Sequence, residues 1–195
     1  MAKLYFRYGA MNSGKSTLLL QTAHNYEERG MKIIIIKPFK DLKAESRISS
    51  RLGAEREVEV LLKPNEDVYE IVNKKYKNIS CILVDEAQFL EPIQVDQLLK
   101  ITVFLNIPVI AYGLRTDFKT QGFPGSTRLL EIAHTIEEMK TICRCGSKAM
   151  FNARFINGEI TTEGDQVAID GLNEVTYESM CPKCYYKKLQ LKKGK

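Results

Sequence analysis

The chain has 195 residues, of which 44% are hydrophobic and 27% charged, and its formal net charge is +5. This composition is ordinary for a soluble globular protein, and the length suits one domain with a small appendage. The sequence contains no run of about 18 apolar residues and no apolar leader segment, so we expect a cytoplasmic protein without a membrane span. Five cysteines are too few for a disulfide scaffold in a chain of this length. Paired cysteines in a cytosolic protein favour metal or redox chemistry.

Positive charge is concentrated at the end of the chain, where five lysines occur within the last nine residues. We interpret residues 188–195 as a basic, disordered tail, because a nucleic-acid-binding face is normally larger and follows one structural element. We therefore expect no stable nucleic-acid binding.

Strand-like and helix-like segments alternate through the first two-thirds of the chain. The alternation predicts a mainly parallel sheet with helices on both faces, and ligands at the carboxyl ends of its strands. Hydrophobic periodicity and turn residues predict strands at 3–8, 31–37, 57–61, 79–84 and 107–112, helices at 16–29, 65–76 and 92–105, and loops at 39–54 and 113–126. Both histidines are expected to be helical, His24 within 16–29 and His134 beyond the loop at 113–126, and neither lies in a recognisable catalytic setting.

A glycine-containing loop joins the first strand to the first helix and matches the pattern G-x-x-x-x-G-K-[ST] in full. Its residues are Gly9, Ala10, Met11, Asn12, Ser13, Gly14, Lys15 and Ser16. The glycines allow successive N–H groups to turn around a phosphate, and the N-terminus of the helix adds a positive dipole end. Lys15 is expected to neutralise the β- and γ-phosphates of ATP, and the Ser16 hydroxyl to hold Mg²⁺. The predicted fold is therefore an α/β P-loop domain of the RecA-like kind.

Two carboxylates follow the apolar strand predicted at 79–84. In P-loop proteins an acid at this position completes the Mg²⁺ shell, and Asp85 fits that role. Glu86 has the chemistry of a general base, which takes a proton from an attacking hydroxyl or orients a water. A solvated surface acid is the alternative interpretation of Glu86.

Two cysteine pairs flank a C-terminal segment with weak strand alternation. Cys143, Cys145, Cys181 and Cys184 offer four thiolates, which suit a tetrahedral structural Zn²⁺ with no open position. A redox pair is less favoured because two pairs occur together. We therefore predict an ATP-binding domain at 1–140, a small zinc-binding domain at 141–187 and the basic tail at 188–195.

Several joined motifs resemble those of the type II thymidine kinases, the zinc-containing family of bacteria and animal cytosol. These motifs are the phosphate loop, Asp85-Glu86-Ala-Gln88-Phe89, Tyr112-Gly113-Leu114-Arg-Thr-Asp117-Phe118, and the paired cysteines with Tyr177 four residues before Cys181. The resemblance spans about residues 3–184 and implies phosphorylation of the thymidine 5′-hydroxyl by ATP.

The resemblance also implies roles for individual residues. Glu86 would be the base for the 5′-hydroxyl, Phe89 and Tyr177 would pack on the nucleoside, and Met11 and Leu114 would lie near the thymine methyl group. A loop around residues 166–171 would fold over the base and bind it largely through backbone hydrogen bonds. The expected substrate-binding set is Met11, Gln88, Phe89, Leu114, Phe118, Gln166, Val167, Ala168, Ile169 and Tyr177. By residue type alone the aromatic members would more often be core residues, and Phe118 would pack within its loop.

The sequence departs from the family pattern at three points. The first cysteine pair has the C-x-C spacing, the stretch from Ile169 to Tyr177 is longer than usual, and an expected Asp-x-Arg is replaced by residues 41–43, so that Lys43 or Arg47 would take the place of the arginine. Kinship also implies a homotetramer inhibited by the end-product triphosphate.

One rival function belongs to a different class, the nucleic-acid-dependent P-loop ATPases. The phosphate loop, the helicase-like run from Asp85 to Gln88 and a zinc ribbon would support it. Against it, the chain has little room for a second motor domain, and acidic residues between the cysteine pairs would repel phosphates.

Overall fold

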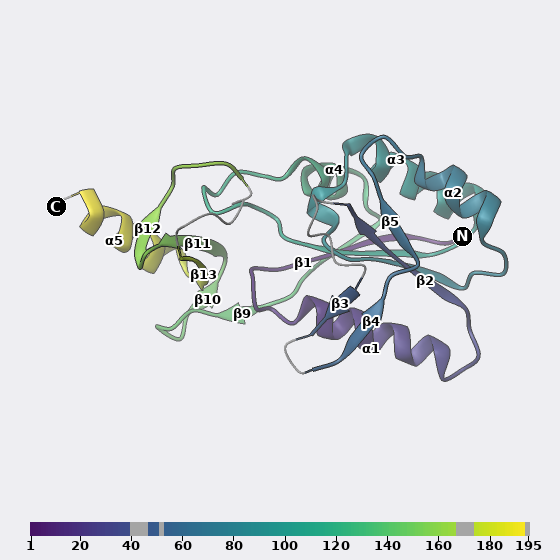
Figure 1. Ribbon diagram of the computed structural model, residues 1–195, viewed down its shortest axis with the longest axis horizontal. Coiled ribbons are helices and arrows are strands. Elements are labelled where there is room, and N and C mark those ends of the chain that lie inside the picture. Colours follow the sequence, from purple (N-terminus) through teal and green to yellow (C-terminus); the bar gives the residue numbers. More distant parts are fainter. Residues whose placement is uncertain (40–46, 51–52, 167–173, 194–195) are drawn as a thin grey trace.

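The protein is described here from a computed structural model, which covers residues 1–39, 47–50, 53–166 and 174–193 (Figure 1). Its centre is a six-stranded parallel sheet with the order β5-β2-β6-β7-β1-β8. The strands are β1 (Leu4–Tyr8), β2 (Ile33–Pro38), β5 (Val60–Leu62), β6 (Cys81–Val84), β7 (Val109–Gly113) and β8 (Thr135–Glu138). The predicted α/β class and parallel sheet are confirmed.

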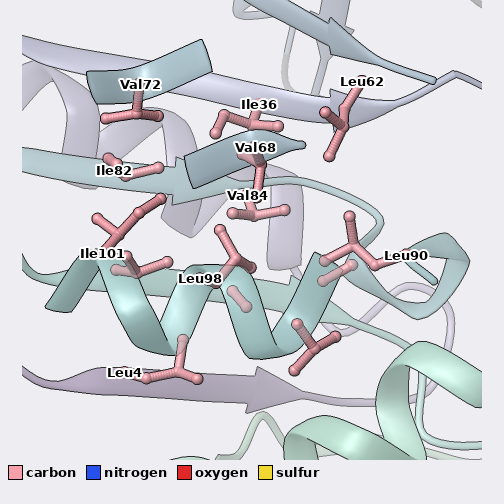
Figure 2. Packing of buried hydrophobic residues seen from close by; sticks show 14 of the residues in the cluster. Leu4, Ile36, Leu62, Val68, Val72, Ile82, Val84, Leu90, Leu98 and Ile101 are labelled. Carbon is pink, nitrogen blue, oxygen red and sulfur yellow. The ribbon is translucent and has the colours of Figure 1, made fainter. Parts of the chain in front are cut away.

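Helices cover both faces of this sheet (Figure 1). One face carries α1 (Lys15–Glu27), and the other carries α2 (Val68–Lys75), α3 (Pro92–Lys100) and α4 (Pro124–Ile132). Successive side chains of a strand point to opposite faces, so Ile33 and Ile35 pack beside α1 while Ile34 and Ile36 pack beneath α2 and α3. Figure 2 shows the face covered by α2 and α3, whose apolar side chains pack against those of β2 and β6. The residues are Val68, Val72, Leu98, Ile36, Ile82 and Val84.

The region after β2 differs from its prediction. The expected polar loop at 39–54 contains β3 (Arg47–Ser49), which pairs antiparallel with β4 (Glu55–Glu57). Ile48 is buried in the core beside α1. Burial of this apolar side chain stabilises the hairpin. The single strand expected at 57–61 is therefore divided between β4 and β5. Helix α2 begins after Asp67, whose side chain accepts a hydrogen bond from the Glu70 N–H, and not after Asn65.

Two elements near residue 130 were absent from the prediction. Helix α4 begins at Pro124 inside the expected loop, and β8 extends the sheet beyond β1. His134, expected in a helix, lies between α4 and β8, and its Nδ1 accepts a hydrogen bond from the Leu4 N–H. The helix expected to reach residue 105 does so, but its end is a π-helical segment, η2 (Ile101–Leu105).

The C-terminal lobe, defined here as residues 141–193, lies at the opposite end of the molecule from the N-terminus (Figure 1). It contains the β9 (Thr141–Ile142) and β10 (Lys148–Ala149) pair, a sheet of β11 (Phe151–Ile156), β12 (Glu159–Thr161) and β13 (Val175–Met180), and α5 (Pro182–Lys193). Its own apolar core includes Ala153, Phe155 and Tyr185. The expected disordered tail is wrong for residues 188–193, which continue α5 as a helix. Within the described ranges, every helix is too short or too polar to cross a membrane.

Candidate functional site

The phosphate loop lies between β1 and α1, as the motif requires. Asn12 and Gly14 have positive φ values of 63° and 79°, and this left-handed backbone turns the loop sharply. Position 9 requires glycine, because a Cβ there would collide with Ser13 and with the Met139 carbonyl oxygen. The Lys15 ammonium donates a hydrogen bond of 2.7 Å to the Ala10 carbonyl oxygen. The loop therefore has the curvature and the cation that suit an anionic phosphate.

A cleft of about 790 Å³ opens at the carboxyl ends of β1, β6 and β7. Sequence-predicted residues from three separate motifs line it: Met11, Asn12, Ser13, Gly14, Lys15, Ser16, Asp85, Glu86, Gln88 and Leu114. Residues that sequence reasoning did not select also line it: Thr17, Leu18, Gln21, Ser49, Ser50 and Gly113. The volume lies in the range of small-molecule sites, and the position is where open parallel sheets bind ligands.

Burial perturbs the charged groups of this cleft. Burial lowers the pKa of Lys15 to about 8, although the carboxylates of Asp85 and Glu86 oppose the change. Burial and the neighbouring Glu86 charge raise the pKa of Asp85 to about 6, against the attraction of Lys37 and Lys15. Two adjacent carboxylates facing a buried cleft are costly unless a cation joins them, so the donor set fits a divalent metal ion.

The backbone of Glu86 is held in the left-handed region, with φ of 48°, which is strained for a residue with a Cβ. Such strain persists only where the surrounding structure enforces it. The short helix η1 (Ala87–Phe89) follows at once, and Gly125 of α4 packs against its carbonyl groups. Without a side chain at Gly125, α4 can hold η1 closely and thereby fix the direction of Glu86.

Gln88 joins the acidic motif to the loop after β7. Its side-chain oxygen accepts a hydrogen bond of 3.1 Å from the Leu114 N–H, and its side chain is 4% exposed. A Cβ at Gly113 would lie 3.0 Å from the same oxygen, so a side chain at this position would crowd Gln88. Gln88 thus fixes where Leu114 lies in the cleft.

The predicted aromatic residues lie outside the lining of this cleft. The Phe89 ring packs edge-on against Phe123, with 5.5 Å between ring centroids. Phe118 is 2% exposed, and the Arg154 guanidinium lies 3.5 Å from its ring centroid. This burial favours loop packing for Phe118 and does not support direct substrate contact. The Tyr177 hydroxyl accepts a hydrogen bond of 2.9 Å from Arg154.

Gln166 begins the segment expected to cover the nucleoside. Its side chain donates to Asp117 across 3.1 Å, and its carbonyl oxygen accepts from Arg154 across 3.2 Å. Val167, Ala168 and Ile169 lie outside the described residues, as do Asp41 and Lys43. Arg47, the other suggested replacement for the family arginine, pairs with Glu55 and Glu57 on the β3–β4 hairpin.

Three buried polar residues of the C-terminal lobe escaped sequence reasoning. Asn152, Arg154 and Ser179 are 3%, 2% and 7% exposed, and each hydrogen-bonds the backbone of another segment. The alternation of Asn152 and Arg154 along an apolar strand was the available signal, because i and i+2 side chains share a face.

The four predicted cysteine ligands come together in the C-terminal lobe. The sulfur atoms of Cys143, Cys145, Cys181 and Cys184 lie within 4.8 Å of one another. The Cys145 and Cys181 sulfurs are 3.6 Å apart, close to the ~3.8 Å edge of a tetrahedron with Zn–S bonds of about 2.3 Å. The donor set therefore fits Zn²⁺.

Comparison with known proteins identifies the family. The thymidine kinase profile matches residues 2–185. The chain belongs to the thymidine kinase family. It is 47% identical over 187 residues to the thymidine kinase of Ruegeria pomeroyi, covering 94% of this chain and 93% of that protein. It is 46% identical over 194 residues to that of Legionella pneumophila strain Philadelphia 1 (96% and 90%), and 44% identical over 188 residues to that of Chromobacterium violaceum (95% and 99%).

The match to the thymidine kinase family confirms the resemblance drawn from the joined motifs. Its span, residues 2–185, agrees closely with the expected span of about 3–184 and includes both cysteine pairs. A chain of this thymidine kinase family is an enzyme of the kinase class.

Proposed function

We propose that the protein transfers the γ-phosphoryl group of ATP to the 5′-hydroxyl of thymidine and so forms thymidine monophosphate. The observation that carries this proposal is the single cleft shared by the phosphate loop, the Asp85–Glu86 pair and the Leu114 loop. Family membership supports the same reaction.

The phosphate loop is the proposed donor site. Its backbone N–H groups would bind the phosphates, and the Lys15 ammonium, now on the Ala10 carbonyl, would move to the phosphate oxygens. Ser16 and Asp85 would hold Mg²⁺, whose charge would neutralise the phosphates. The raised pKa of Asp85 supports this role, since the carboxylate gains most from a cation where burial penalises its charge.

Glu86 is the proposed general base. Its carboxylate would take the proton of the 5′-hydroxyl while that oxygen attacks the γ-phosphorus, and the bond to the β–γ bridging oxygen would break to release ADP. The enforced backbone at Glu86 supports this role, because a base must be held within reach of its proton.

The acceptor site would combine the cleft with the neighbouring aromatic residues. Met11 and Leu114 line the cleft and would contact the base, with Gln88 holding the Leu114 loop in place. Phe89 and Tyr177 would pack on the nucleoside, while Gln166 to Ile169 would cover the base. Phe118 would contribute through Arg154, which stacks on its ring.

Zinc would be structural and would be held by the two cysteine pairs. It would fix Cys143 and Cys145 before β11 to Cys181 and Cys184 after β13, and so join both ends of the segment that covers the substrate. We further propose, from kinship, a cytoplasmic homotetramer without stable nucleic-acid binding.

ADP release from ATP·Mg²⁺ distinguishes this function from the nucleic-acid-dependent ATPase. The purified protein is assayed with each common deoxynucleoside and, separately, with single-stranded DNA. Stimulation by thymidine alone supports the kinase. Stimulation by DNA without a phosphorylated nucleoside would refute it.

A further inference from the structure

The C-terminal lobe binds both backbone polar groups of one phosphate-loop residue. The Met11 N–H donates a hydrogen bond of 2.7 Å to the side-chain oxygen of Asn152. The Met11 carbonyl oxygen accepts one, also of 2.7 Å, from the Ser179 hydroxyl. Both partners are more than 140 residues away in sequence, so these bonds exist only when the lobe is in place.

Asn152 and Ser179 act as one unit because they are opposite each other in an antiparallel pair. Asn152 of β11 is the register partner of Ser179 of β13, so their side chains share a face of the sheet. Asn152 also donates to the Thr116 carbonyl oxygen across 3.3 Å, in the loop after β7. The pairing of β11 with β13 therefore holds the two residues next to each other, and the hydrogen bond to Thr116 joins Asn152 to a second loop. We call Asn152 and Ser179 the β11–β13 clamp.

The clamp fixes two consecutive peptide groups of the phosphate loop. The peptide between Ala10 and Met11 donates its N–H to Asn152, while its carbonyl oxygen accepts from the Lys15 ammonium. The next peptide gives its carbonyl oxygen to Ser179. Its N–H, on Asn12, points away from the clamp, because the two groups of a trans peptide face opposite ways.

We propose that Asn152 and Ser179 are positioning residues for binding of the phosphate donor. By fixing the Met11 peptides, they hold the phosphate loop in the conformation that binds the donor. The inference rests on the proposed ATP site. It makes donor affinity depend on the C-terminal lobe, to which the proposed function otherwise assigns only the acceptor contacts and the zinc site. Pre-organised N–H groups bind an anion without the cost of ordering the loop at the moment of binding.

A purely structural role for the clamp makes a different prediction, and the chain offers a matched control. The Tyr185 hydroxyl of α5 donates a 2.6 Å hydrogen bond to the Phe118 carbonyl oxygen. This bond also joins the lobe to the rest of the molecule and is buried, but it does not touch the phosphate loop. If the clamp only docks the lobe, Ser179→Ala and Tyr185→Phe should affect ATP binding alike.

The test measures the Kd of ATP·Mg²⁺ by calorimetry, without thymidine, for the full chain and its Ser179→Ala, Asn152→Ala, Ser179→Thr and Tyr185→Phe variants. Thermal melting of each variant reports its stability. We expect Ser179→Ala to weaken ATP binding by up to about tenfold, because ATP must then order a loop that one buried hydrogen bond no longer holds. Asn152→Ala should weaken ATP binding at least as much. Ser179→Thr, which keeps a hydroxyl group, should retain the affinity of the unmodified protein. Tyr185→Phe should lower the melting temperature and leave the Kd unchanged.

Two results would overturn the clamp. Either Ser179→Ala and Asn152→Ala bind ATP·Mg²⁺ as the unmodified protein does, or Tyr185→Phe weakens binding as much as they do. Failure of the unmodified protein to bind ATP·Mg²⁺ is a separate result that refutes the proposed function itself.

Discussion

Burial of the Lys15 ammonium predicts that ATP binding weakens in mildly alkaline solution. Its pKa is lowered from 10.5 to about 8 mainly by burial. Phosphates bind the charged form, so above pH 8 most binding events must also take up a proton. With this pKa, about nine in ten molecules carry the charge at pH 7 and about one in ten at pH 9. The Kd of ATP·Mg²⁺ should therefore rise about tenfold between these two values.

Calorimetry at pH 7, 8 and 9 without thymidine measures this dependence and avoids any ionisation of the acceptor. Repeating the titration at pH 8.5 in buffers of different ionisation enthalpy should reveal the uptake of a fraction of a proton. Lys15→Arg is the control, because a guanidinium stays charged throughout and should remove the slope even if affinity falls. A Kd that changes less than about twofold from pH 7 to pH 9, the expectation for an unperturbed lysine, would refute the reasoning. So would a slope that persists in Lys15→Arg.

Three substitutions test other parts of the site. Glu86→Gln should bind both substrates normally yet lose about 10²–10⁴-fold in kcat, and near-normal turnover would remove Glu86 from its role. Gly125→Ala would put a methyl group 2.6 Å from the Leu90 carbonyl oxygen. It should cost about 1–3 kcal/mol of unfolding free energy and lower kcat by displacing η1, whereas an unchanged denaturation midpoint would contradict this packing. Cys184→Ser should reduce the zinc content measured by atomic absorption and destabilise the C-terminal lobe, and a zinc-free unmodified protein would refute the metal assignment.

The parts of the structure that the sequence predicted well are those encoded locally. The unbroken apolar run Ile33–Ile36 is typical of a strand buried on both faces, and it forms β2, an inner strand of the sheet between β5 and β6. The phosphate loop and the cysteine pairs have spacings set by their chemistry, so the motifs alone are enough to locate them along the chain.

The parts that were missed depend on long-range contacts. The β3–β4 hairpin forms because one apolar residue, Ile48, reaches the core from an otherwise polar stretch. Strand β8 is recognisable only through its pairing with β1. In the sequence, Asn152 and Ser179 have no feature that distinguishes them from other polar strand residues. Their role follows from their hydrogen bonds with Met11 in the folded protein. Propensity and periodicity do not report such contacts.

Transfer of label from [γ-³²P]ATP tests the central claim most directly. The protein is incubated with labelled ATP, Mg²⁺ and thymidine, and the products are separated. The proposed function predicts that the label appears in thymidine 5′-monophosphate in proportion to the ADP formed. Label recovered as inorganic phosphate, with thymidine unchanged, would contradict it.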